Sequence, residues 1–298
     1  MTFQRFGYVT LICLYLLVLA GGIVRSTGSG MGCPDWPKCF GQWVPPTQVS
    51  ELPFNYQEIY REKLHGEVEF NATKTWIEYL NRLLGALTGL VMAITTVLAW
   101  KENKRVFYYT LTAFLLVMAN AILGKYVVDS FLLAGVVTAH MLLTTGVLFF
   151  LLKALNNSAQ IHVLNSNDRN WILINAIIIF TQILLGTQVR ENMDHVIVDL
   201  GYNAKNTWID HLGNMYIIHR TFSWLIILSH VYLWKKMPVS TDFITYKKTF
   251  AILISLSLIS GVIMAYTALP LGSQPIHLAT SLLLLGLHFH AWQRTKNA

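Results

Sequence analysis

Long apolar stretches, separated by short polar segments, run through the whole chain. Each is about 20 residues long, the length of an α-helix that crosses a bilayer core. Lipid offers no hydrogen bonds to the backbone, so such stretches predict helices that satisfy their own peptide groups. The pattern predicts eight transmembrane helices, at residues 7–25, 76–100, 106–128, 134–153, 171–189, 215–234, 249–268 and 275–292.

The second half of the chain repeats landmarks of the first half at a shift of 137 or 138 positions. A nearly constant offset of this kind indicates an internal duplication. The corresponding positions are Asn81-Arg82 with His219-Arg220, Gly124 with Gly261, and His140 with His277. The predicted fold is an all-α integral membrane protein of two pseudo-symmetric four-helix bundles. The first bundle spans residues 1–155 and carries an outer loop at 26–75, and the second spans 156–298.

Composition agrees with a membrane protein, because 54% of the residues are hydrophobic and only 12% are charged. Lysine and arginine concentrate at 101–105, 153–170 and 235–248 and in the tail. By the positive-inside rule these segments and both termini are cytoplasmic, in a multi-pass protein of the plasma (inner) membrane. The net charge of +7 follows from this asymmetry. It therefore gives no reason to expect nucleic acid as a partner beside the lipid bilayer.

The first apolar stretch also has features of a signal peptide, since a basic residue precedes it and small residues follow. Its apolar run continues past those small residues, so we expect a retained helix. Cys33 and Cys39 lie in the outer loop, on the oxidising face. There they predict a disulfide, either as a structural link or as a redox-active pair. A metal site is less favoured, because no further ligands lie nearby.

His219 and His277 each lie about one turn inside the outer end of a predicted helix. Both helices run from outside to inside, so the two rings are expected at similar depth. Two facing imidazoles between packed helices are typical of b-type haem ligation. Arg220 and Arg190 are placed to pair with haem propionates. The alternative for each histidine alone is a hydrogen-bonded ring near the interface.

The first half offers a related pocket with one ligand missing. His140 corresponds to His277, but Asn81 stands at the position of His219 and is a poor ligand for iron. A pocket with one histidine leaves a coordination site open, which suits chemistry better than electron transfer. Glu78 lies on the same face as Asn81, one turn earlier, and is a candidate for proton transfer. The alternatives are that Glu78 caps its helix or pairs with Arg82 at i, i+4.

Another pair of histidines follows the first at a spacing of 11 residues, close to three helical turns. His230 lies below His219, and His288 lies below His277. One hypothesis is a second haem toward the cytoplasm, and the alternative is a pair of ordinary rings near the inner interface.

These residues resemble the heme A synthase family over essentially the whole chain. The most specific stretch is GGIVRSTGSGMGCPDWPKC at 21–39, which in this family follows the first helix and leads into the outer loop. Glu78-x-x-Asn81-Arg82 is similar to the family's Glu-x-x-His-Arg, and His219-Arg220 to its second His-Arg. The chain departs from the family at Asn81, which replaces a histidine. It also lacks the cysteine pair that some members carry in the second outer loop.

The resemblance implies an oxidoreductase that oxidises the C8 methyl group of heme O to a formyl group. The product, heme A, serves terminal cytochrome oxidases. Haem B would reside in the second half, held by the two histidines there. Glu78 would act at the reaction centre, and substrate would contact a set made of His140, Asn81, Arg82 and Arg25. The farnesyltransferase that makes heme O is a candidate partner. The electron donor, the oxygen source and the oligomeric state, a homo-oligomer included, stay open.

Two other functions compete with this interpretation. A b-type electron-transfer cytochrome, for example a quinol-linked membrane subunit, explains His219 and His277. It does not explain Glu78 or the one-histidine pocket. A transporter also uses repeats, but it needs broken helices or charges at the midplane, and the sequence offers few of either.

Overall fold

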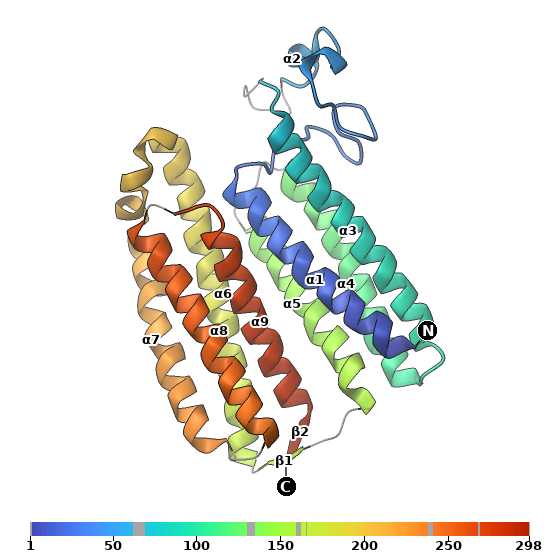
Figure 1. The fold of residues 1–298 in the computed structure, drawn as a ribbon, viewed down its shortest axis with the longest axis vertical. Helices are drawn as coiled ribbons and strands as arrows, with labels where there is room; N and C mark the ends of the chain where they lie inside the picture. The colour runs from blue at the N-terminus through green and yellow to red at the C-terminus, as the bar shows by residue number, and fades with distance from the viewer. Residues whose placement is uncertain are drawn as a thin grey trace.

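A computed structural model describes residues 2–61, 69–129, 135–158, 162–164, 166–237, 241–267 and 269–297 (Figure 1). Part of the expected outer loop, 62–68, lies outside these residues. The fold is helical, and each predicted apolar stretch falls on a long helix. The long helices are α1 (Phe3–Ser26), α3 (Ala72–Ala99), α4 (Lys104–Asp129), α5 (Val136–Leu155), α6 (Ser166–Leu200), α7 (Gly213–Lys236), α8 (Thr241–Tyr266) and α9 (Ser273–Gln293).

Six of these helices are long and apolar enough to cross a membrane by length and composition, namely α1, α3, α4, α5, α6 and α8. The prediction of a helical multi-pass membrane protein is thereby confirmed at this level. The described residues also form shorter elements, namely α2 (Tyr56–Ile59), 3₁₀ segments at Val49–Glu51, Asn156–Ser158 and Tyr202–His211, and two strands. The strands, β1 (His162–Leu164) and β2 (Thr295–Asn297), pair in parallel near the chain's C-terminal end.

The long helices lie in two groups that stand side by side in Figure 1. One group holds α1, α3, α4 and α5, and the other holds α6 to α9. Within the groups the closest pairs are α1 with α3, α4 with α5, α6 with α7, and α8 with α9. Between the groups, α9 packs against α1 and α5. By contrast, α7 and α8 touch each other at few points.

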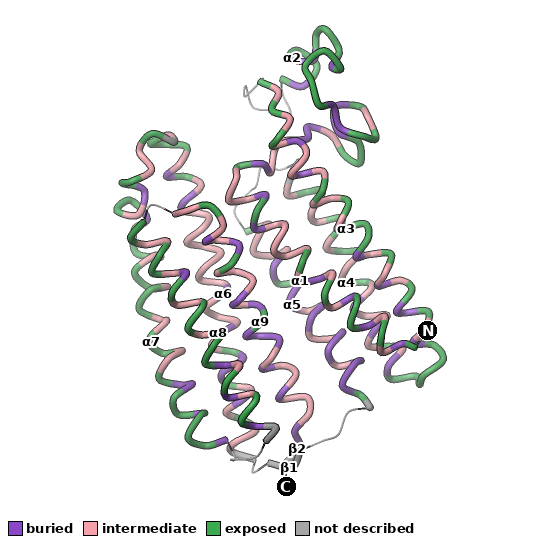
Figure 2. Tube along the Cα trace, in the orientation of Figure 1, coloured by how far each residue is buried: buried purple, intermediate pink, exposed green. Residues whose placement is uncertain are grey.

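The burial pattern is the one expected for a bundle surrounded by lipid. Buried apolar side chains such as Leu148, Leu282 and Leu285 fill the contacts between helices. Large apolar side chains also cover the outward faces, where Trp100 is 72% and Ile122 is 71% exposed. Figure 2 shows this exposed character along the outer helices. A water-soluble protein of this size does not expose so much continuous apolar surface.

The predicted C-terminal end of the fifth helix was wrong. We expected it to end at 189 and a loop to occupy 190–214, but α6 continues to Leu200 and a 3₁₀ segment follows. The extension is amphipathic, with Met193 and Val196 buried against Trp208 and Leu212. Hydropathy alone therefore ended the helix too early, because this last part is stabilised by packing outside the apolar stretch. Arg190, expected at a helix end, lies inside α6.

Candidate functional site

Each of the three predicted ligand histidines faces a glycine on the long helix that precedes it. A Cβ atom built on that glycine would lie only 3.2–3.4 Å from the ring carbon Cε1. The contact at Gly186 is tighter than about nine in ten real Cβ contacts, and the other two are at the lower limit of ordinary contact, so the absence of a side chain leaves room for each ring. The pairs are Gly124 with His140, Gly186 with His219, and Gly261 with His277.

Asn81 occupies the fourth position of the same kind. A Cβ atom on Gly21, in α1, would lie 4.0 Å from its Oδ1 atom. That oxygen is buried and has no hydrogen-bond partner. A glycine therefore faces the side chain at four corresponding positions, which we call seats, each on a pair of adjacent helices; the contact at Asn81 is looser than the three at the histidines. Three hold an imidazole and one holds an amide.

From the sequence, Gly124 and Gly261 were matching landmarks of the repeat, and the small residues around Gly261 were expected to let a helix approach a porphyrin closely. A contact of each glycine with a histidine was not predicted, although one signal was available. Gly124 precedes His140 by 16 residues, and Gly261 precedes His277 by the same 16 residues. A glycine and a histidine at equal spacing in both repeats indicate a contact between adjacent helices. The other two seats have longer connections between their helices, so spacing alone does not find Gly186 or Gly21.

The rings of His219 and His277 face each other with their centroids 6.2 Å apart and their planes at 68°. An imidazole nitrogen lies about 2 Å from a metal that it binds. Two rings on opposite sides of one ion therefore have centroids roughly 6 Å apart, as here. Sequence reasoning placed these histidines at similar depth, and the structure brings them together.

Hydrogen bonds also fix the tautomer of His277 that a metal ligand needs. Its Nδ1 lies 2.8 Å from the backbone carbonyl of Ser257 and 3.0 Å from the hydroxyl of Ser260. The carbonyl can only accept, so Nδ1 carries the hydrogen and the lone pair is left on Nε2. A ligating histidine commonly donates its other N–H in this way, which fixes the tautomer and the ring orientation. The residues present therefore fit a bis-histidine haem.

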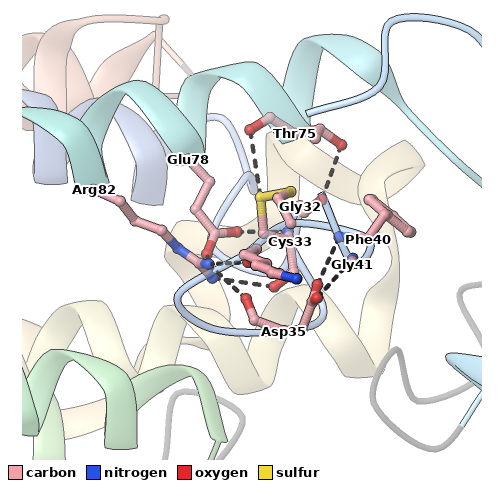
Figure 3. Close-up of a disulfide and its surroundings, with 10 residues drawn as sticks. Gly32, Cys33, Asp35, Phe40, Gly41, Thr75, Glu78 and Arg82 are labelled. Atoms are coloured by element: carbon pink, nitrogen blue, oxygen red, sulfur yellow. Dashed lines mark hydrogen bonds and ion pairs between the residues drawn. A yellow bond between two sulfur atoms is a disulfide. The ribbon is translucent and has the colours of Figure 1, made fainter. Parts of the chain in front are cut away.

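Glu78 is 3% exposed and is held by two groups (Figure 3). Its Oε1 accepts a hydrogen bond from Arg82 at 2.5 Å, and its Oε2 accepts one from the backbone N–H of Cys33 at 2.9 Å. The i, i+4 pair named among the alternatives is therefore present. A buried carboxylate with two partners is fixed in place, so pairing and a chemical role are compatible for this residue.

Arg82 ties the loop after α1 to helix α3 (Figure 3). Besides Glu78, its guanidinium donates to the carbonyl oxygens of Asp35 at 2.6 Å, Lys38 at 3.2 Å and Cys33 at 3.2 Å. These contacts satisfy the guanidinium within the protein. The structure gives Arg82 a positioning role for Glu78 and the loop, and its expected contact with substrate stays a prediction.

The predicted disulfide between Cys33 and Cys39 is confirmed. Both cysteines are almost fully buried, at 0% and 1% exposure, which favours a structural link over an accessible redox pair. The carboxylate of Asp35 accepts backbone N–H bonds from Phe40 and Gly41 across the same loop. The loop thus packs compactly over the N-terminal end of α3.

Close packing holds this loop against the helix. A Cβ atom on Gly32 would collide with the backbone of Lys74 at 2.6 Å, so only glycine fits there. Thr75 donates its hydroxyl hydrogen to the carbonyl of Gly32 at 2.9 Å. Tyr60 packs edge-on against Phe40, and its burial, together with the negative charge of Asp35, raises the pKa of the phenol. Tyr60 therefore stays neutral at physiological pH.

Arg25, near the C-terminal end of α1, and Arg190 of α6 come together between the two helix groups. Both form ion pairs with Asp194, a residue that sequence reasoning missed. Arg190 also donates to the backbone carbonyl of Arg25 at 3.2 Å. Contact with substrate by Arg25 and with propionates by Arg190 remain predictions, and Asp194 is the carboxylate that such groups would join or displace. Arg220 is exposed, with its guanidinium 5.9 Å from the ring of Tyr216.

The fold and this site define a helical membrane protein that presents paired imidazoles between its helices. The chain belongs to the COX15-CtaA family of cytochrome oxidase assembly proteins, whose family model matches residues 4–289. The resemblance found in the sequence is thereby confirmed.

Individual relatives agree with this assignment. A heme A synthase of Bartonella bacilliformis is 26% identical over 99% of this chain and 92% of its own length. A heme A synthase of Shewanella oneidensis is 26% identical over 69% of this chain and 62% of its own length. A third, from Bartonella quintana, is 25% identical over 97% of this chain and 91% of its own length.

Proposed function

We propose that this protein is a heme A synthase, an oxidoreductase that converts the C8 methyl group of heme O to a formyl group. The observation that carries this proposal is the buried carboxyl of Glu78, which lies in the first half only, one turn from the Asn81 seat. The second half has Tyr216 at the corresponding position. An electron-transfer cytochrome has no use for this difference, whereas an enzyme that oxidises one haem with the help of another requires it.

We propose that α7 and α9 cross the membrane together with the six helices that meet the apolar criterion. They are 24 and 21 residues long, enough to span about 30 Å. The protein then consists of two four-helix units, 1–155 and 156–298. Both chain ends lie at the same end of the helices, opposite the loop with α2 (Figure 1). With the basic segments at that end, the termini are assigned to the cytoplasmic side of the plasma (inner) membrane.

We assign haem B to the seats of His219 and His277. Haem bound there supplies reversible one-electron chemistry. The protein's own contribution is to fix two ring planes, leave a lone pair on Nε2 of His277, and make room for the rings at Gly186 and Gly261. Arg190 and Arg220 are the cationic groups assigned to the propionates.

Heme O is assigned to the first half, with His140 as the ligand of its iron. The ring of His140 is seated against Gly124, and its Nδ1 atom is buried without a hydrogen-bond partner. Asn81 offers an amide on the opposite seat, so iron there has one protein ligand and one open side. Arg25 is the cation assigned to a substrate propionate.

Glu78 holds or moves a proton at its carboxyl oxygens, which are fixed by Arg82 and the N–H of Cys33. We propose direct transfer of heme O from the farnesyltransferase that makes it, because this would keep so apolar a substrate out of water.

The test is expression in a bacterial host that makes heme O but lacks its own heme A synthase. Extraction and chromatography of membrane haems should show heme A with the wild-type chain. His140→Ala should abolish heme A and leave the haem B content of the purified protein unchanged. His195→Ala is the matched control, because that ring is exposed near the end of α6, away from the four seats. Persistence of heme A in His140→Ala would contradict the assignment of substrate to the first half.

A further inference from the structure

The second histidine pair, His230 and His288, lies in the inner half of the helix group α6 to α9. Their ring centroids are 5.0 Å apart, with the planes at 81°. This is closer than the roughly 6 Å expected for two rings on opposite sides of one iron, so the pair does not fit the second haem considered from the sequence. His288 is fully buried and stacks on Phe250 at 4.3 Å.

Both rings keep a lone pair that has no partner. The Nδ1 atom of each histidine lies 2.8 Å from a backbone carbonyl one turn earlier, at Ile226 and Leu284. A carbonyl only accepts, so Nδ1 carries the hydrogen and Nε2 is an acceptor in both rings. Both Nε2 atoms are buried and lack a hydrogen-bond partner. An unsatisfied buried acceptor is costly, which indicates that a donor from outside the protein belongs at this place.

A cavity of about 410 Å³ lies between α7 and α8 and has His230 in its wall. This is the region where these two helices touch at few points. Most of its wall is apolar, with side chains such as Ile227, Leu233 and Ile254. Val231 and Trp234 line it and are 51% and 44% exposed on the helix surface. The cavity is therefore open to molecules that diffuse within the bilayer.

Two lysines stand at the inner end of this cavity. Lys247 is buried, at 7% exposure, with its ammonium 5.8 Å from the ring of Trp234. Lys235, from the last turn of α7, lines the same cavity. The cavity thus offers a hydrogen-bond acceptor at His230, a donor at Lys247 and apolar walls between them.

We propose that this cavity binds a hydroquinone with an apolar tail, which supplies the electrons of the reaction. The inference rests on the proposed function. A hydroquinone hydroxyl donates to Nε2 of His230, a second oxygen accepts from Lys247, and the tail lies along the apolar wall. His230 is placed 11 residues below His219 on the same helix, about 16 Å along its axis.

The reaction balances with dioxygen as the oxidant. Each hydroxylation of the substrate methyl group follows R–CH3 + O2 + QH2 → R–CH2OH + H2O + Q. One C–H bond and the O–O bond break, one C–O bond forms, and the hydroquinone is oxidised to the quinone. The two electrons and two protons that it loses leave in the water molecule. His230 accepts the first hydroxyl proton at Nε2, where the lone pair is available.

Other ligands match the cavity less well. The phosphate and ester oxygens of a phospholipid only accept hydrogen bonds, so they cannot bind the lone pair of His230, and a headgroup hydroxyl that does donate is carried on a charged phosphate rather than on an apolar body. A metal ion would need more ligands than two imidazoles, and no group of three or more candidate ligands occurs in the described part of the chain. A hydroquinone offers a donor, an acceptor and an apolar body in a single molecule.

The test uses the purified full-length protein and an azido-substituted decylbenzoquinone as a photoreactive probe. Labelled peptides mapped by mass spectrometry should come from 227–258, and decylubiquinol should compete. Ala251→Phe fills the cavity and should reduce labelling by about tenfold, equivalent to about 1.4 kcal/mol. Ile252→Phe is the matched control, because the neighbouring side chain is 59% exposed and does not line the cavity. His230→Phe should lose labelling, and His230→Gln, which keeps an acceptor, should recover part of it.

Labelling elsewhere in the chain, or labelling unaffected by Ala251→Phe, overturns the proposal. So does competition by phosphatidylglycerol as strong as that by decylubiquinol, because the cavity is then a lipid site. Elution as a single species on size exclusion verifies that each variant is folded. Heme A measured in the same cultures separates the two proposals. Labelling of the cavity without heme A refutes only the enzymatic function, and heme A without labelling refutes only the hydroquinone site.

Discussion

The two halves of this protein share one arrangement of helices but carry different residues at corresponding positions. In the second half, His219 and His277 face each other at 6.2 Å, and Tyr216 stands one turn away. In the first half the same seats hold Asn81 and His140, and Glu78 replaces the tyrosine. We propose that the two halves differ in role because the second carries two facing imidazoles, whereas the first carries a buried carboxyl beside a position with a single histidine. The halves also differ in cover, because only the first carries the disulfide loop that fixes Glu78.

The largest expected effect comes from removing the carboxyl that distinguishes the first half. Glu78→Gln keeps the size of the side chain but cannot hold or release a proton. Heme A formation should fall by about a hundredfold or more, the range of general acid–base catalysis, with haem B content unchanged. Chromatography of extracted haems measures both quantities. Glu102→Gln, in the exposed turn between α3 and α4, should behave as wild type. Full activity in Glu78→Gln would remove the main chemical difference between the halves.

The next largest effect is expected when the second half is given asparagine at the position of His219, as the first half has at Asn81. His219→Asn would remove one of the two proposed ligands of the haem iron, so the affinity for haem B should fall by at least about tenfold. The haem content of the purified protein, measured as the pyridine haemochrome, reports this loss. A variant that retains haem B with an unchanged spectrum would show that His219 is not a ligand.

A smaller effect is expected from filling one of the glycine seats. In Gly186→Val the new side chain meets the ring of His219, since even a Cβ atom lies 3.2 Å from Cε1. The ring must tilt, and haem binding should weaken by about tenfold. Gly89→Val is the matched control, because no atom lies within 4 Å of its added Cβ. Equal haem content in both variants would mean that the seats do not position the rings.

The smallest effect is expected at the ion pairs that join the halves. Asp194→Asn removes the charge shared by Arg25 and Arg190 and leaves both arginines available to propionates. Partly exposed ion pairs contribute little to stability, so heme A formation should change by no more than about threefold. The yield of folded protein and the rate of heme A formation test this. A large loss of folded protein together with a large loss of heme A formation would contradict this prediction and show that the ion pairs are needed to assemble the two halves.

Much of the fold follows from the sequence, because the bilayer imposes its thickness on every helix. The apolar stretch at 134–153, for example, appears as Val136–Leu155. The disulfide was predictable from two cysteines in one short outer segment. The end of α6 was not, since Met193 and Val196 are buried by a 3₁₀ segment whose position hydropathy does not encode.

Within the candidate site, residue types were predictable and contacts between helices were not. The sequence indicated histidines at similar depth and a carboxyl beside Asn81. It could not show that Arg82 is occupied by loop carbonyls, because those contacts depend on how the loop folds back onto α3. Asp194 was missed for the same reason, since its partner Arg25 comes from the other half of the chain.

The most direct test of the central claim is the electron paramagnetic resonance spectrum of the purified oxidised protein, recorded before and after addition of heme O. The account predicts a low-spin bis-histidine signal from resident haem B. That signal should be lost in His277→Ala and kept in His140→Ala. Added heme O should give a second, distinct signal that depends on His140. A low-spin haem B signal that survives His277→Ala, or that disappears in His140→Ala, would contradict the division of labour between the two halves.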